Sequence, residues 1–136
     1  MSFVLDASTT LAWAIENERN ALALATLDRL ASEKAEVPGH WALEVANGLL
    51  MAVRRKRLSD TARLDALANL TELPIHSDDE TAARAGHETT AVAARYGLSV
   101  YDAAYLELAI RRRLPLATLD DALAAAAQAA GVELFA

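Results

Sequence analysis

The chain has 136 residues, a formal net charge of −6 and no cysteine. This length fits a single domain over residues 1–136, and the lack of cysteine excludes disulfides, thiolate metal sites and cysteine nucleophiles, which suits the cytoplasm. No apolar run approaches the roughly 18 residues that span a bilayer, and the N-terminus lacks a basic stretch followed by a long apolar one, so we expect neither membrane insertion nor export.

Short apolar runs alternate with helical patterns along the chain. In chain order, we predict a strand at 3–5, helices at 8–15 and 20–32, an extended segment at 36–38, helices at 41–54 and 59 to about 70, a strand at 73–76, helices at 78–96 and 102–113, a strand at 114–118, a helix at 121–130 and a strand at 132–135. Strands separated by helices imply right-handed crossovers. The sequence therefore predicts an α/β fold with a short, mostly parallel sheet of four to five strands and helices on both faces.

Four acidic residues occupy the ends of these elements. Asp6 directly follows the first strand, and Asp120 follows the strand at 114–118 after one residue. Asp102 opens its helix, and Glu44 lies early in its own. In open α/β sheets, ligands bind at the carboxyl ends of the strands. We therefore expect the four carboxylates to meet at one edge of the sheet.

Such a group of carboxylates indicates a metal site. Neighbouring carboxylates repel, so at least one pKa would rise unless a cation compensates. Mg²⁺ prefers hard oxygen ligands and keeps several waters, and Mn²⁺ suits the same ligands. The pattern favours a metal-dependent phosphodiesterase in which water attacks the phosphate directly. Each acid alone is as typical of a helix cap or a turn, so their joint placement carries the hypothesis.

Two basic clusters lie at the ends of predicted helices, at residues 54–57 and 111–113. Cations at a helix C-terminus stabilise it through the helix dipole, by about 0.3 to 1 kcal/mol each. They would also offset the acidic centre and hold the backbone of a polyanion beside it. The sequence leaves both interpretations open.

The stretches around the acids resemble the PIN-domain family, and most closely the VapC-type toxins of bacterial toxin–antitoxin pairs. The matching stretches, in the same order along the chain, are residues 4–8, 41–47, 98–105 and 116–120. The resemblance implies a PIN-like fold and an endoribonuclease that depends on Mg²⁺ or Mn²⁺. It also implies a homodimer held inactive by a small antitoxin, whose tail occupies the acidic groove.

Site residues are carried over from the family position by position. The catalytic and metal-binding acids would be Asp6, Glu44, Asp102 and Asp120. The supporting polar residues would be Ser8, Asn47 and Thr118. Asp121 is adjacent to Asp120, so the resemblance leaves open which of the two points into the site.

Other functions fit the sequence less well. His40, His76 and His87 lack zinc-ligand spacing and are expected outside the site. An aspartyl-phosphate mechanism would require a second acid two residues after Asp6, where Ser8 stands instead. A catalytically silent module that binds RNA or a partner through the same fold remains the alternative.

Overall fold

The computed structural model describes residues 1–15 and 20–136, and these form a four-stranded parallel sheet in the order β3-β2-β1-β4. The strands are β1 (Ser2–Leu5), β2 (Lys34–Val37), β3 (Ile75–Ser77) and β4 (Leu116–Ala117). β1 is central: Phe3 pairs with Ala35 of β2, and Leu5 pairs with Ala117 of β4. The predicted α/β fold with a short parallel sheet is confirmed.

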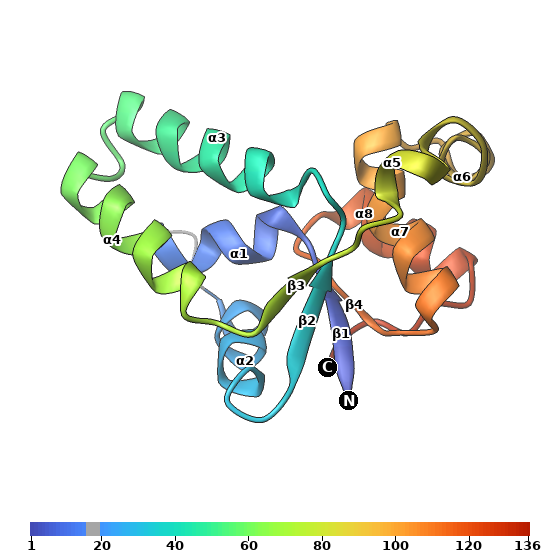
Figure 1. The fold of residues 1–136 in the computed structure, drawn as a ribbon, viewed down its shortest axis with the longest axis horizontal. Helices are drawn as coiled ribbons and strands as arrows, with labels where there is room; N and C mark the ends of the chain where they lie inside the picture. The colour runs from blue at the N-terminus through green and yellow to red at the C-terminus, as the bar shows by residue number, and fades with distance from the viewer. Residues whose placement is uncertain (16–19) are drawn as a thin grey trace.

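Helices cover both faces of the sheet. They are α1 (Ala7–Ala14), α2 (Ala21–Arg29), α3 (Trp41–Arg54), α4 (Asp60–Thr71), α5 (Thr81–Arg84), the π-helical turn η2 (Ala85–Thr89), α6 (Thr90–Tyr96), α7 (Val100–Arg112) and α8 (Asp121–Ala129). Figure 1 shows α1 to α4 on one side of the strands and α5 to α8 on the other. Among the described residues, no helix combines the length and the apolar character needed to cross a membrane.

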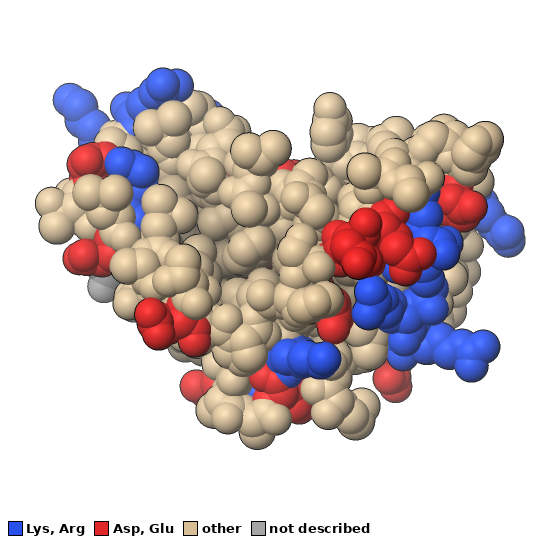
Figure 2. Space-filling view, in the orientation of Figure 1, with Lys and Arg blue, Asp and Glu red and all other residues tan. Residues whose placement is uncertain are grey.

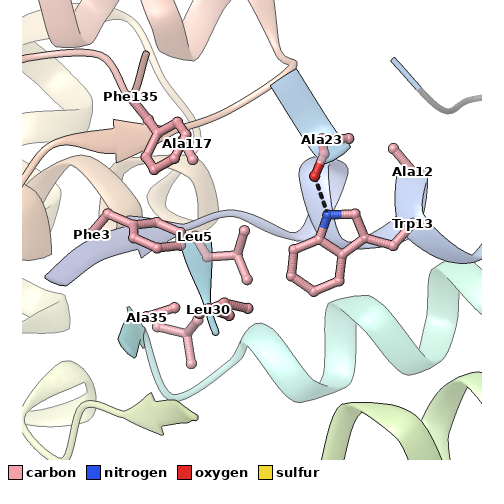
Figure 3. Close-up of a cluster of buried hydrophobic side chains, with 10 residues drawn as sticks. Phe3, Leu5, Ala12, Trp13, Ala23, Leu30, Ala35, Ala117 and Phe135 are labelled. Atoms are coloured by element: carbon pink, nitrogen blue, oxygen red, sulfur yellow. Dashed lines mark hydrogen bonds between the residues drawn. The ribbon is translucent and has the colours of Figure 1, made fainter. Parts of the chain in front are cut away.

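The alternation of side chains along β1 supplies the two cores. Phe3 and Leu5 are buried on the side of α1 and α2, and Figure 3 shows them with Trp13 and Phe135. Val4 points to the opposite side, into a cluster formed mainly by α7 and α8. The Trp13 indole is 9% exposed and donates a hydrogen bond of 2.7 Å to the carbonyl of Ala23, which fixes α1 against α2. Side chains of the central strand β1 thus pack against the helical layers on both faces of the sheet.

Two predicted elements differ from the structure. The predicted helix at 78–96 begins only at Thr81 and contains the π-helical turn at its centre, although it ends before Gly97 as expected, at a φ of 68°. Asp78 stays outside the helix because its carboxylate is buried in ion pairs with α7. The predicted strand at 132–135 forms a single bridge, from Leu134 to Leu116, because β4 is only two residues long.

Candidate active site

The four acids predicted from the sequence line one pocket of about 210 Å³. Its lining residues are Asp6, Ala7, Ser8, Leu11, Glu44, Asp102, Tyr105 and Asp120. Asp6 follows β1, Glu44 and Asp102 lie in the first turns of α3 and α7, and Asp120 precedes α8. Asp121 is exposed and does not line this pocket. The structure therefore brings together acids that are up to 114 residues apart in the chain.

Asp6 is the most deeply buried of the four, with 3% of its surface exposed. It is the N-cap of α1: its Oδ1 accepts hydrogen bonds from the backbone N–H and the hydroxyl of Thr9, at 2.9 and 2.8 Å. Such a cap satisfies one of the free N–H groups in the first turn of a helix. Burial raises the pKa of Asp6, and the hydrogen bonds to the carboxylate counteract this only in part.

Two hydroxyl groups connect the end of β1 to the end of β4. Thr118 Oγ1 donates to Asp6 Oδ2 and accepts a 3.0 Å hydrogen bond from the backbone N–H of Asp120. Ser8 Oγ donates to both oxygens of Asp6, at 2.8 and 2.9 Å, and accepts from the N–H of Leu119 at 3.2 Å. These contacts fix the relative position of two of the four acids.

Glu44 is held by two residues that the sequence did not assign to the site. The Tyr105 hydroxyl donates a 2.5 Å hydrogen bond to Glu44 Oε1, and His40 Nε2 lies 3.1 Å from the same oxygen. Burial acts to raise the pKa of Glu44, but the hydrogen bonds from His40 and Tyr105 and the charge of His40 outweigh it and lower that pKa. Tyr105 itself is buried, and burial and its bond to Glu44 raise the pKa of its hydroxyl, which remains a donor.

The sequence contained signals for both missed residues. His40 lies four residues before Glu44, and Tyr105 lies three residues after Asp102, so each shares a helical face with a site acid. The Tyr105 contact is not evident in the sequence because Tyr105 and Glu44 are 61 residues apart and lie on different helices. His40 was expected outside the site; it does not line the acidic pocket, but it contacts Glu44, which does.

Asp102 and Asp120 complete the acidic pocket. Asp120 is the N-cap of α8, and its Oδ1 accepts from the N–H of Leu123 at 2.9 Å. Burial raises the pKa of Asp102, and the negative charges of Asp120 and Glu44 raise it further. The acids are therefore close enough to repel one another.

This repulsion is the observation that fits a cation. Among the described residues that line the pocket there is no lysine or arginine. No three of these acids bring carboxylate oxygens within 4.8 Å of one another, so a bound ion would be held by a subset of them and by water. Mg²⁺ is commonly bound in this way, through one or two carboxylates with several retained waters.

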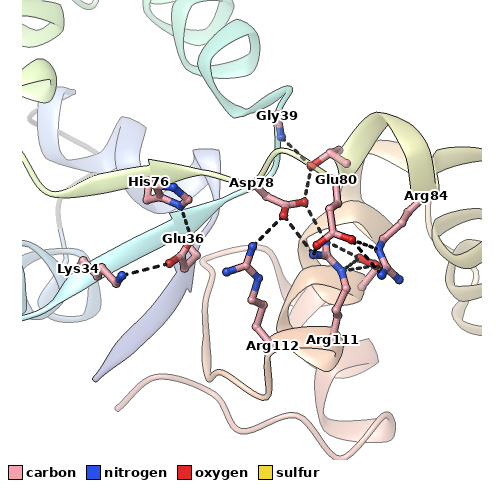
Figure 4. A network of polar contacts seen from close by, with 11 residues as sticks. Lys34, Glu36, Gly39, His76, Asp78, Glu80, Arg84, Arg111 and Arg112 are labelled. Carbon is pink, nitrogen blue, oxygen red and sulfur yellow. Dashed lines mark hydrogen bonds and ion pairs between the residues drawn. The ribbon is translucent and has the colours of Figure 1, made fainter.

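A separate acidic group does bring one carboxylate oxygen from each of three residues within 4.8 Å of one another; its members are Asp78, Asp79 and Glu80. Figure 4 shows arginines in contact with two of its members, Asp78 and Glu80. The carboxylate of Asp78 accepts from Arg111 at 2.8 and 3.1 Å and from Arg112 at 3.1 Å, and Glu80 pairs with Arg111 at 3.3 Å. Arg111 lowers the pKa of Asp78 well below its usual range, despite the opposing effect of burial. Asp78 and Glu80 thus belong to an ion-pair network between the segment that follows β3 and α7.

Three other predicted groups lie elsewhere. Asn47 is exposed on α3 and does not line the acidic pocket. Arg111 and Arg112 are engaged by Asp78, so most of that basic cluster serves the fold. Residues 54–57, at the end of α3, are all exposed.

Comparison with known proteins places this architecture in a family. The model of the PIN domain matches residues 3–129. The chain is 36% identical over 132 residues to Ribonuclease VapC3 of Pyrobaculum aerophilum, covering 91% of this chain and 93% of that protein.

Two solved structures share the fold. PAE2754 from Pyrobaculum aerophilum matches with a TM-score of 0.72 at 22% identity, over 93% of this chain and 84% of that one. FitAcB from Neisseria gonorrhoeae matches with a TM-score of 0.54 at 21% identity, over 100% of this chain and 97% of that one. The family model and the VapC3 relative carry the assignment: the chain belongs to the PIN-domain family, in its VapC group.

Proposed function

We propose that this chain is a metal-dependent endoribonuclease that acts as the toxin of a toxin–antitoxin pair. The observation that carries the proposal is the convergence of Asp6, Glu44, Asp102 and Asp120 on one pocket. The name of the VapC3 relative, a ribonuclease, supports RNA as the substrate. A nuclease of this kind hydrolyses phosphodiester bonds without a nucleophilic side chain, and no cysteine is present to supply one.

A subset of the four acids, together with water, would hold Mg²⁺ or Mn²⁺. Such an ion, when bound, supplies charge neutralisation at the phosphate and lowers the pKa of a coordinated water. The protein's part is to hold its carboxylates in place. Thr118 and Ser8 orient Asp6, while Tyr105 and His40 both contact Oε1 of Glu44. Fixed ligand geometry of this kind is what positions a substrate for in-line attack.

The partners follow from the family resemblance. We propose that the active form is a homodimer and that a small antitoxin inhibits it by occupying the acidic pocket. Light scattering of the purified chain tests the first statement, and growth of a host that co-expresses the chain with the neighbouring upstream reading frame tests the second. A monomer at micromolar concentration would overturn the first, and unchanged toxicity on co-expression would overturn the second.

Cleavage of RNA by the purified chain tests the enzymatic proposal. We expect cleavage with added Mg²⁺ or Mn²⁺, none in EDTA, and loss of cleavage in Asp6→Asn and Asp102→Asn. Asp121→Asn is the matched control, because it removes an adjacent carboxylate that does not line the pocket and should leave cleavage intact. Persistent cleavage in both site variants would remove these acids from the mechanism. RNA binding by the wild-type chain without cleavage would favour the silent binding module.

A further inference from the structure

A second pocket, of about 240 Å³, lies at the C-terminal end of α3. Its lining residues are Leu11, Ile15, Gly48, Met51, Ala52, Arg55 and Arg57. Leu11 also lines the acidic pocket, so the two pockets share a wall. A chain that leaves the acidic pocket over Leu11 therefore enters this second pocket next.

One face of α3 joins the two pockets. Glu44, Gly48, Ala52 and Arg55 follow one another at spacings of three or four residues, which places them on the same side of the helix. With a rise of 1.5 Å per residue, Glu44 and Arg55 are about 16 Å apart along the axis. This separation spans several backbone units of an extended polymer.

Gly48 allows Leu11, which separates the two pockets, to lie close to the backbone of α3. A Cβ at this position would lie 2.4 Å from Leu11 Cδ1 and 2.7 Å from Cδ2, so any larger residue would displace the leucine. Leu11 rests directly on the backbone of α3 as a result. The wall shared by the pockets is therefore a single apolar side chain, with no charged group on it.

The second pocket carries the positive charge of Arg55 at its rim. Four consecutive basic residues begin at Arg54, the last residue of α3, and continue to Arg57. Figure 2 shows blue side chains gathered at the end where α3 turns into α4. Arg55 is exposed and has no carboxylate partner among the residues that the structure describes. Arg111 and Arg112 differ, because both are bound to Asp78.

We infer that the Arg55 pocket binds the phosphate backbone of an RNA strand a few nucleotides from the bond that is cleaved. The inference rests on the proposed function. An exposed guanidinium binds phosphate through two parallel N–H groups, and such contacts fix register without reading sequence. A chain with a net charge of −6 needs a local cationic site of this kind to hold a polyanion beside its acidic centre.

Arg55→Gln and Arg54→Gln test the inference as a matched pair. Both substitutions remove one positive charge from the end of α3, but Arg54 does not line the pocket. Steady-state cleavage of a short single-stranded RNA should show a KM raised roughly tenfold in Arg55→Gln with kcat nearly unchanged, because the lost contact is made equally in ground and transition states. Arg54→Gln should change KM by less than about twofold.

Binding gives a readout that does not depend on cleavage. In the Asp102→Asn background, fluorescence anisotropy with the same RNA at several salt concentrations yields the slope of log K against log [salt]. Loss of one phosphate contact to a single strand should reduce that slope by about 0.7 in Arg55→Gln and not in Arg54→Gln. Thermal melts of both variants establish that each is folded.

Equal effects of the two substitutions on KM and slope would overturn the inference. The effects would then come from the loss of one positive charge near the end of α3 and not from a specific contact with Arg55. Unchanged RNA binding in Arg55→Gln together with weaker binding of an acidic peptide would also overturn it, in favour of a protein partner. If the wild-type chain cleaves no RNA, the proposed enzymatic function fails. The slope measured by anisotropy still decides whether Arg55 contacts the backbone.

Discussion

Asp6 serves the fold and the candidate site at once, and two substitutions separate these roles. Asp6→Ala removes the N-cap of α1, at a cost of about 1 kcal/mol. It also deprives the buried hydroxyls of Thr9 and Thr118 of their acceptor, at about 1 kcal/mol each, while removing a buried charge offsets part of the loss. We expect the free energy of unfolding to fall by about 2 to 3 kcal/mol.

Asp6→Asn retains an oxygen for the cap and removes the charge, but its NH2 group replaces the oxygen that accepts from Thr118. Because burial raises the pKa of Asp6 above 3.8, the ionised carboxylate disfavours the folded state. The stability of the wild-type chain therefore falls as the pH rises from 3.8 through the pKa in the folded protein. In EDTA at pH 7 we expect the Asn variant to be more stable than the Ala variant, and its stability relative to wild type to decrease as the pH approaches 3.8.

Calorimetry and cleavage assays together test this reasoning. At about 2.1 cal/mol/K of unfolding entropy per residue, a chain of 136 residues changes its Tm by about 3.5 °C per kcal/mol, so Asp6→Ala should melt about 7 to 10 °C lower. Neither variant should cleave RNA. Asp28→Asn, an exposed carboxylate on α2, is the control and should stay within about 0.5 kcal/mol of wild type. An Asn variant as unstable as the Ala variant would refute the argument.

Three further measurements follow from the structure. Asp78→Ala should lower the free energy of unfolding by about 3 kcal/mol in urea, because Arg111 loses a buried partner, whereas the exposed Asp79→Ala should change it by less than about 0.5 kcal/mol. Since the pKa of Asp78 is lowered, this difference should be present above pH 3.8 and fade as the pH falls below it. Tyr105→Phe should reduce kcat about tenfold with little change in KM, because Glu44 loses a donor, and an unaltered kcat would exclude Tyr105 from positioning that acid. Mg²⁺ at about 100 times its Kd should stabilise the chain by about 2.7 kcal/mol in thermal melts, and no shift in Tm with Mg²⁺ or Mn²⁺ would argue against a metal site.

The sequence predicted those features that depend on local pattern and on topology. A buried strand that ends at Asp6 and a parallel sheet are enough to place Asp6 and Asp120 at one edge, because parallel strands share their carboxyl ends. Glu44 and Asp102 were predicted at the same edge because each lies near the start of a helix. Whether these residues catalyse a reaction stays a prediction.

The features that were missed depend on pairings across the fold. The run Asp78-Asp79-Glu80 is typical of a helix start, but a contact with Arg111, 33 residues later in the chain, keeps Asp78 outside the helix. The same contact engages arginines that the sequence left available for a polyanion. Tyr105 was missed because its partner, Glu44, lies 61 residues away on another helix. Local propensity contains no information about such distant partners.

The attachments of α7 have a consequence for the spacing of the acids. Near its start the helix is tied to α3 through Tyr105 and Glu44, and at its end Arg111 ties it to Asp78 beyond β3. The helix is thus held by side-chain contacts near both of its ends, and Asp102 lies about 13 Å from Arg111 along the helix axis. Loss of the contact between Arg111 and Asp78 would let α7 tilt, and the distance between Asp102 and β1 would change. Substitutions at Arg111 or Asp78 would therefore change the spacing of the acids, and with it the activity, while every residue that lines the pocket stays the same.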